Sequence, residues 1–432
     1  MKELINKVKN LTKRKVAKNA MWMIGERIFQ MILSLFVSII SARYLGPENY
    51  GTLQYGAALV TLVSAIAKLG LDNIIIKEYI NRKDENGLIL GSVFGMRMIS
   101  GVLSIVSVMT YIFIFNSDDN VIIITTFLQS FILIFEAFDL IDFWFQSKLK
   151  SKNVSIAKSI AYVVMSVYKI VLLILGKSVE WFAFASSLEY IVILIILFRM
   201  YFKNGGQKLK FSFNEGKKLI KQGYHFILAS LMITLYTQMD KIMLGELRSE
   251  AEVGLYSVAI AISNLWGFIP NAIITSMRPT IYEAKKSNEQ IYKKRTRQLY
   301  ALVFWCGIIF ALGTTIFSGL IIDVLYGEQY KGAVMALKIV SWSTIFAYIG
   351  SARSVWIVCE DKNRYSKKYV FWGAVINLIL NFIMIPRIGI TGAAIATLIA
   401  QVVVAIVAPL FYKETKNSVK EIIDGILLKG VK

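Results

Sequence analysis

The residue types that build most metal and redox centres are scarce in this chain of 432 residues. It contains one histidine, His225, and two cysteines, Cys306 and Cys359, which stand far apart in apolar surroundings. This set has neither the ligand spacing of a zinc site nor the spacing of a disulfide framework. We therefore expect no metal, no cofactor and no disulfide, with both cysteines packed among apolar side chains.

Charged residues are also few, and this scarcity excludes an ordinary soluble protein. They make up 18% of the chain, whereas hydrophobic residues make up 56%, and the mean hydropathy is +0.58. A soluble domain averages about 45–50% apolar residues. The excess lies in runs of roughly 20 residues or more, the length that a helix needs to cross a bilayer. The sequence thus predicts an all-α integral membrane protein.

Twelve membrane spans follow from these apolar runs. We expect them at 20–43, 50–71, 88–115, 121–146, 154–176, 179–202, 222–245, 253–277, 298–317, 333–358, 369–386 and 389–412. No stretch between them is long enough to fold as a separate domain, so the chain has no room for an extracellular enzyme module.

The loops between these spans differ sharply in basic charge. One set of alternating loops, with the two ends, carries 35 lysines and arginines, and the other set carries only five: Arg43, Lys177, Arg248, Lys331 and Arg387. Basic residues concentrate in cytoplasmic loops, so both termini are predicted to be cytoplasmic. The same bias accounts for most of the net charge of +21, which therefore does not indicate a nucleic-acid partner.

A central basic loop divides the chain into two halves. We predict an N-terminal six-helix bundle over 1–203, a cytoplasmic linker over 204–221, a C-terminal six-helix bundle over 222–413 and a cytoplasmic tail over 414–432. The halves share a short repeat at an outer turn, in which Leu45-Gly46 matches Leu244-Gly245 and Tyr50-Gly51 lies opposite Val253-Gly254. Two halves with the same orientation are parallel repeats, and transporters commonly place their substrate path between such halves.

Three carboxylates interrupt the apolar stretch "FLQSFILIFEAFDLIDFWFQ": Glu136, Asp139 and Asp142. A charge at the centre of a membrane helix costs on the order of 2.5 kcal/mol or more. At steps of three, the acids fall within one helical sector of roughly 120°. We expect them to face an aqueous vestibule, although Asp142 can also lie at the membrane–water interface. There they would balance fixed cations, bind sugar hydroxyls or carry a coupling proton or sodium ion.

Other charges within the spans complete the candidate site. The candidates for substrate binding in a cavity are Arg27, Arg97, Glu26, Glu136, Asp139, Lys68 and Arg353, and those for ion coupling are Glu136, Asp139, Asp142 and Asp240. For the deep arginines the alternative is a buried ion pair with Glu26 or Glu136. Lys68, Lys158 and Arg353 lie near the inner ends of their spans, from which such side chains can reach the lipid headgroups. Asp240 and Lys241 can alternatively form a structural pair.

Proline interrupts one predicted span. Pro270 follows Gly267 by three residues within 253–277. Such interrupted spans often contain a mobile or ligand-facing segment, and a static kink is the alternative.

Four stretches, in order along nearly the whole chain, resemble a known family. They are "SARYLGPENYGTLQYGAAL", "DFWFQSKLKSKN", "LYGEQYKGAVMALKIVS" and "NLILNFIMIPRIGITGAAIATLIAQ". Together they resemble bacterial oligosaccharide repeat-unit flippases of the Wzx type, the polysaccharide-transporter branch of the multidrug/oligosaccharidyl-lipid/polysaccharide exporter superfamily. In the last stretch, Pro386 and Gly389 fit a tight outer turn, and Gly392 fits close helix packing.

The resemblance implies two six-helix bundles around a central cavity in the bacterial cytoplasmic membrane. It implies movement of undecaprenyl-diphosphate-linked oligosaccharide to the outer leaflet for O-antigen, lipopolysaccharide or capsule assembly. The implied partners are this lipid-linked substrate, membrane lipids and polysaccharide polymerase or assembly proteins. Alternatives are a drug/cation antiporter or peptidoglycan-precursor flippase of the same superfamily, and a membrane polysaccharide polymerase or acyltransferase. The single histidine and short external loops argue against an enzyme.

The loop charges predict which positions face outward. Single cysteines at 48 or 328 should react with a membrane-impermeant thiol reagent added to intact cells, whereas cysteines at 207 or 288 should react only after the membrane is opened. Labelling of position 207 in intact cells would contradict the predicted orientation.

Overall fold

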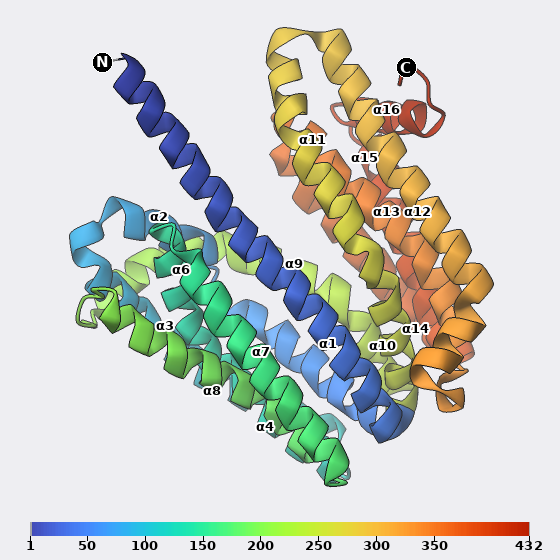
Figure 1. The fold of residues 1–432 in the computed structure, drawn as a ribbon. Helices are drawn as coiled ribbons and strands as arrows, with labels where there is room; N and C mark the ends of the chain where they lie inside the picture. Colours follow the sequence, from blue (N-terminus) through green and yellow to red (C-terminus); the bar gives the residue numbers. More distant parts are fainter. Residues whose placement is uncertain (1, 432) are drawn as a thin grey trace. The chain divides into compact units, whose positions relative to one another are not determined.

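All regular structure in the described part of the chain is helical (Figure 1). The computed structural model describes the backbone of residues 2–431, and the side chains of residue 19 and of residues 21–431 except residue 73. Ten helical stretches in this part are long and apolar enough to cross a membrane. The chain is therefore a multi-pass all-α membrane protein, as predicted.

Two of these ten stretches each contain two predicted spans. Met21–Ala67 has 47 residues and Asn363–Leu410 has 48, so at about 1.5 Å per residue each is roughly 70 Å long. A hydrocarbon core is only about 30 Å thick. Each stretch is broken at a glycine with non-helical backbone angles, Gly46 (φ 76°, ψ 170°) and Gly389 (φ 54°, ψ −136°). Counted on either side of these breaks, the twelve predicted spans all correspond to helical segments.

The chain forms two compact units. Unit 1 contains the residues up to Leu45 and Gly56–Leu231, and unit 2 contains Gly46–Tyr55 and the chain from Met232 onward. The short segment Gly46–Tyr55 therefore leaves unit 1, packs in unit 2 and returns.

Unit 1 is built from the first nine helices and two short 3₁₀ turns. They are α1 (Lys2–Ala67, without Gly46–Tyr55), α2 (Asp72–Asn81), η1 (Lys83–Glu85), α3 (Asn86–Phe115), α4 (Asn120–Ser130), α5 (Ile132–Phe135), η2 (Glu136–Phe138), α6 (Asp139–Ser147), α7 (Ser151–Ile174), α8 (Val179–Lys203) and the first half of α9 (Phe213–Leu247).

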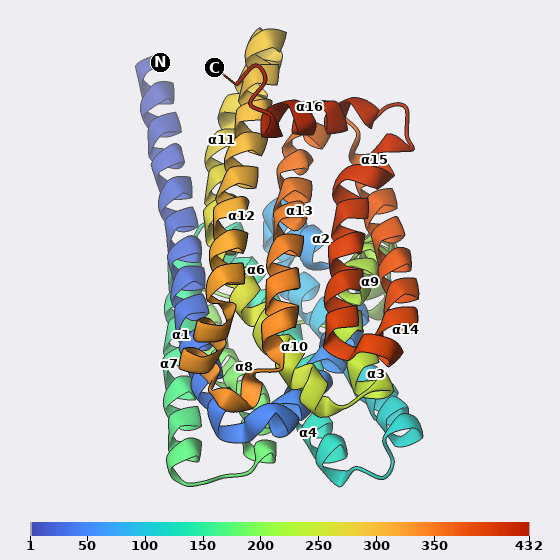
Figure 2. The same ribbon diagram turned by 90° about the vertical axis from the view of Figure 1, so that its right-hand side faces the viewer.

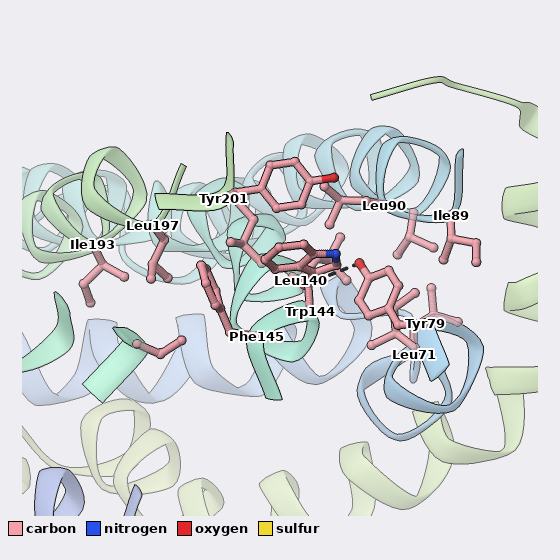
Figure 3. Packing of buried hydrophobic residues seen from close by; sticks show 14 of the residues in the cluster. Leu71, Tyr79, Ile89, Leu90, Leu140, Trp144, Phe145, Ile193, Leu197 and Tyr201 are labelled. Carbon is pink, nitrogen blue, oxygen red and sulfur yellow. Dashed lines mark hydrogen bonds between the residues drawn. The ribbon is translucent and has the colours of Figure 1, made fainter. Parts of the chain in front are cut away.

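The core of unit 1 is an aromatic and aliphatic cluster (Figure 3). Trp144 and Tyr201 pack edge to face with ring centroids 4.8 Å apart. The Tyr79 hydroxyl in the same cluster donates to the Leu140 carbonyl at 3.4 Å. Leu219 of α9 is fully buried in this cluster, so the start of α9 is anchored to unit 1.

The segment that joins the two halves is also fixed to unit 1. Gly87, Gly91 and Gly95 form one stripe on α3, and a Cβ at Gly91 would lie 2.4 Å from the Lys210 carbonyl oxygen. Because the stripe lacks side chains, the extended segment before α9 lies directly on α3. Its Lys210 amide donates to the Gly87 carbonyl at 3.0 Å.

The fourth predicted span, 121–146, is called span 4 here, and the other spans are numbered in the same order. Span 4 is irregular although it contains neither proline nor glycine. Its helix is divided into α4, α5, the 3₁₀ turn η2 and α6. A Cβ at Gly101 of α3 would lie 2.6 Å from the Leu133 carbonyl oxygen, so α3 contacts the backbone of span 4 just before the turn. The turn begins at Glu136, the first of the three acids.

Unit 2 contains the second half of α9 and the helices after it. They are α10 (Glu250–Asn264), η3 (Leu265–Gly267), α11 (Phe268–Ser287), α12 (Glu289–Tyr326), η4 (Glu328–Tyr330), α13 (Ala333–Cys359), α14 (Asn363–Val402), the π-helical turn η5 (Val403–Val407), α15 (Ala408–Leu410) and α16 (Lys416–Ile426). In this unit α12, α13 and α14 lie side by side, and α16 lies across their ends (Figure 2).

The expected interruption of span 8 is present. The 3₁₀ turn Leu265–Gly267 separates α10 from α11, three residues before Pro270. Pro270 has no amide N–H to complete an α-helical bond to the Trp266 carbonyl, which explains the tighter turn there.

The tail helix α16 is an integral part of unit 2. Arg297 of α12 donates to Glu421 at 2.6 Å and pairs with Asp424 at 2.9 Å. Ile422 is fully buried beneath it. Just before α16, Glu414 accepts hydrogen bonds from Arg364 and Lys362. These bonds, that of Arg364 first, lower the pKa of the Glu414 carboxyl to about 2, so the carboxyl is ionised at neutral pH.

The repeated glycines noted in the sequence meet at a backbone crossing within unit 2. A Cβ at Gly51 would lie 1.7 Å from the Glu250 carbonyl oxygen, and one at Gly254 would lie 2.1 Å from that of Pro47. No side chain fits on either residue, so the short segment and α10 cross at backbone contact.

The outer turn of α14 depends on two further glycines. Gly389 combines φ 54° with ψ −136°, a backbone conformation that residues with a side chain avoid, and a Cβ there would lie 2.4 Å from a Glu252 carboxylate oxygen. A Cβ at Gly392 would lie 2.6 Å from the Met384 carbonyl oxygen. The exposed Pro386 carbonyl accepts a hydrogen bond from Arg248 at 3.5 Å.

These contacts predict which glycines tolerate a methyl group. Gly51→Ala and Gly392→Ala should lower the thermal midpoint and the yield of folded protein, because overpacking against backbone costs about 1–3 kcal/mol. Gly313→Ala is the control, because no atom lies within 4 Å of its Cβ position, and it should be neutral or slightly stabilising. Equal midpoints for Gly51→Ala and Gly313→Ala would contradict the close crossing.

Candidate functional site

The three acids of span 4 lie beside two lysines from neighbouring helices. Glu136 accepts from the ammonium of Lys68, the residue after α1, at 3.1 Å and from the Ser64 hydroxyl at 2.6 Å. Asp142 accepts from the Lys158 ammonium of α7 at 2.6 Å. We call Glu136, Asp139, Asp142, Lys68 and Lys158 the acid–lysine ladder.

Asp139 lies between the two ion pairs of the ladder. The charges of both Lys158 and Lys68 act on it, together with those of Glu136 and Asp142. A buried charge is tolerated only when it is paired. The lysines therefore explain why three acids are tolerated in an apolar span, and the acids explain the buried lysines. The two lysines therefore point to these carboxylates.

The two charged residues early in α1 have different surroundings. Glu26 lies near Tyr162 and Lys158 of α7, and the charge of Lys158 acts on it, which links it to the ladder. Arg27, the next residue, is exposed on the surface of unit 1.

Arg97 is the most buried of the predicted cationic candidates. Its side chain is 2% exposed and pairs with Asp72 of α2. The sequence suggested Glu26 or Glu136 as the acid of such a pair, but Glu136 pairs with Lys68. Asp72 directly follows the apolar run of span 2, and its position along the sequence does not indicate that it pairs with Arg97.

Arg353 is buried in unit 2 and bonded to backbone. Its guanidinium donates to the carbonyls of Ala405 at 2.7 Å and Val404 at 2.9 Å. Pro409 has no N–H for Ala405, and the Ala408 amide donates to Val403 instead of Val404. Arg353 therefore satisfies the two carbonyls that the π-helical turn leaves free, and it does not reach the headgroups.

A second carboxylate, Asp240 of α9, is buried in unit 2 among neutral polar groups. Asn381 donates to one oxygen at 2.6 Å, and the other accepts from Tyr256 at 2.6 Å and from Thr397. The Asn377 amide oxygen accepts from Asn381 at 3.1 Å. We call these five residues the Asp240 site.

The Asp240 site contains an acceptor that the described residues leave unsatisfied. The Asn381 side-chain oxygen is buried, and no described donor reaches it. The adjacent Lys241 ammonium donates to Gln54 at 3.0 Å, so it does not form the direct structural pair considered from the sequence. A carboxylate and an unsatisfied amide oxygen side by side can bind a cation or take up a proton.

Sequence reasoning found the acids of both clusters but missed their neutral partners. Asn377 and Asn381 stand one helical turn apart in an apolar span, and this i, i+4 spacing of two amides was the available signal. Tyr256 and Thr397 come from two other spans, and only the fold brings them to Asp240.

Comparisons with known proteins agree with the fold. Residues 16–285 match the family model described as "Polysaccharide biosynthesis protein", and residues 226–383 match the MatE family model. The solved structure of the lipid II flippase MurJ in an inward closed conformation has a TM-score of 0.70 at 15% identity, over 95% of this chain and 90% of that chain. An inward-facing multidrug resistance MATE transporter gives a TM-score of 0.68 at 15% identity, over 91% of this chain and 96% of that one.

Curated relatives cover almost the whole chain at low identity. The capsular polysaccharide biosynthesis protein CapF of Staphylococcus aureus is 20% identical over 92% of this chain and 99% of its own length. The putative O-antigen transporter of Escherichia coli K12 is 21% identical over 94% of this chain and 99% of its own. The chain therefore belongs to the polysaccharide biosynthesis protein family, the Wzx-type transporters of the multidrug/oligosaccharidyl-lipid/polysaccharide exporter superfamily, and it is a transporter and not an enzyme.

Proposed function

We propose that this transporter is a cation-coupled flippase for lipid-linked oligosaccharide. It moves undecaprenyl-diphosphate-linked repeat units from the cytoplasmic to the outer leaflet of a bacterial cytoplasmic membrane, by alternating access, for O-antigen or capsule assembly. The relatives named as an O-antigen transporter and a capsule biosynthesis protein support this substrate class. Membrane lipids surround the lipid tail, and polymerase or assembly proteins take over the exported unit.

The structure of the Asp240 site is the observation that supports coupling of transport to a cation. The Asp240 carboxylate is 5% exposed and its described hydrogen-bond partners are all neutral, so a cation bound beside it would stabilise its charge. The neutral oxygens of Asn377, Asn381 and Thr397 suit a sodium ion, because hard cations prefer oxygen ligands. A proton would need only the carboxylate, so we assign sodium.

The diphosphate requires a cation elsewhere. Arg27 is exposed on unit 1 and has the permanent charge and forked donors that suit phosphate. The acid–lysine ladder keeps the surroundings of Glu26 polar and is the second candidate for carrying a coupling charge.

Restoration of export tests the proposed function. Bacteria that lack their own repeat-unit flippase but keep every glycosyltransferase should regain surface glycan when they express this chain. The lipid-linked unit should be chemically unchanged after transfer. Full expression in the membrane without surface glycan, with a matching repeat unit present, would contradict the proposal.

Sodium binding at Asp240 is directly measurable. Sodium should raise the thermal midpoint of the purified protein, while potassium at equal ionic strength should not, because binding to the folded state stabilises it. In Asp240→Asn the sodium effect should disappear and export should fall roughly tenfold or more. Asp323→Asn, which removes an exposed carboxylate of the same unit, is the control and should keep both. A sodium response retained in Asp240→Asn would exclude this site.

Arg27 and Arg97 can be separated by rescue. Arg27→Ala should abolish export at a near-normal protein level, and Arg27→Lys should keep part of it, because charge survives without the fork. Asp72→Asn should destabilise the protein, since it leaves Arg97 buried and unpaired, but by less than the about 3–5 kcal/mol of a fully buried pair, because Asp72 is 42% exposed. The neutral double variant Asp72→Asn/Arg97→Met should recover the folded level. If the double variant folds but does not export glycan, Arg97 also binds substrate. If it both folds and exports glycan, Arg97 has only a structural role.

A further inference from the structure

Unit 1 contains a pocket of about 290 Å³ in which seven of the ten lining residues are polar. It lies between α1, span 4 and α8. The polar residues that line it are Thr61, Ser64, Lys68, Gln129, Glu136, Ser186 and Tyr190. Thr61 is exposed and Lys68 is 31% exposed, so the pocket is reached from the surface of unit 1.

Each helix gives the pocket one face of its surface. Thr61 and Ser64 on α1 and Lys68 directly after it stand at helical spacing, as do Gln129 and Glu136 on span 4. Ser186 and Tyr190 are one turn apart on α8. Polar side chains on three adjacent spans thus converge on one pocket, which is unusual in segments that are otherwise apolar.

The pocket is electrically balanced. Its only formal charges among the lining residues are Lys68 and Glu136, which pair at 3.1 Å. The Ser64 hydroxyl donates to Glu136, and the Thr61 hydroxyl donates to the Ala57 carbonyl at 2.6 Å. The lone pairs of both hydroxyls stay available as acceptors, the Tyr190 hydroxyl adds a donor and an acceptor, and the Gln129 side-chain oxygen adds an acceptor.

This chemistry fits hydroxyl groups better than phosphate or hydrocarbon. A diphosphate needs net positive charge, which the paired Lys68 does not supply. A lipid tail needs walls without polar groups, whereas only Ala57, Val60 and Ile132 of the ten lining residues are apolar. A hydroxyl-rich ring both donates and accepts, and the volume is at the low end of the roughly 300–1,000 Å³ of small-molecule pockets.

We propose that this pocket binds one hydroxyl-rich sugar ring of the lipid-linked substrate and selects among glycans. This inference rests on the proposed function of glycan export. Thr61 and Tyr190 contact the ring by hydrogen bonds, Tyr190 adds an aromatic surface, and the Lys68–Glu136 pair holds the floor of the pocket polar without attracting the diphosphate.

Binding of simple sugars to the full-length protein tests the assignment. Purified protein in lipid nanodiscs would be titrated with methyl pyranosides of glucose, galactose and N-acetylglucosamine, and binding followed by saturation-transfer NMR. At least one glycoside should bind, and sodium pyrophosphate should not displace it. Thr61→Val and Tyr190→Phe should each weaken binding by roughly three- to tenfold, the effect of one lost hydrogen bond.

Thr110→Val is a matched control. Thr110 is also exposed on a helix of unit 1, and its hydroxyl likewise donates to the carbonyl four residues earlier, at 2.8 Å. It should bind the glycoside as the unaltered protein does. Equal binding by Thr61→Val, Tyr190→Phe and Thr110→Val, no binding of any glycoside, or displacement by pyrophosphate would overturn the proposal.

Export assays separate this failure from failure of the proposed function. If the unaltered chain restores surface glycan but the sugar titrations fail as described, only the pocket assignment falls. If it restores no glycan at all, the flippase function falls first. Where both hold, Thr61→Val and Tyr190→Phe should change the relative export of two repeat units that differ in one ring, and Thr110→Val should not.

Discussion

The cost of placing charge in hydrocarbon governs the interior of this protein. Each charged side chain within an apolar span must be paired, hydrogen-bonded or hydrated. The acids of span 4 meet Lys68 and Lys158, Arg97 meets Asp72, and Arg353 meets two backbone carbonyls. Asp240, like Arg353, has only neutral hydrogen-bond partners in the described structure, but beside it lies the Asn381 side-chain oxygen, which no described donor satisfies. The same constraint that makes the other charges structural thus makes Asp240 the candidate for a cation.

The helices depart from regular α-helical geometry next to some of these buried charges. The 3₁₀ turn η2 begins at Glu136, and the π-helical turn η5 presents the carbonyls that Arg353 binds. Both lie within otherwise helical spans, where a free carbonyl is costly unless another group satisfies it. Glycine has a different role, because it allows two backbone segments to cross in direct contact. The crossing at Gly51 and Gly254 leaves no space for a side chain.

The sequence determined the spans well but not the partners within them. Long apolar runs and breaks at Gly46, Pro270 and Gly389 follow from local chemistry, so all of these were predicted or are easily explained. The break at Glu136 was not, since it depends on contact of α3 with span 4 through Gly101. The partner of Arg97 and the oxygens around Asp240 come from different spans, and residue spacing along one helix cannot identify contacts between helices.

Transport driven by a sodium gradient tests the central claim most directly. Proteoliposomes that contain the purified chain and a fluorescent lipid-linked oligosaccharide would be given a sodium gradient of either direction, and the labelled glycan on the outer leaflet measured with an impermeant quencher. The account predicts that reversing the gradient reverses the net movement of an unmodified substrate, and that this dependence is lost with Asp240→Asn. Movement at the same rate in both gradients, or equal movement in empty liposomes, would contradict a cation-coupled flippase.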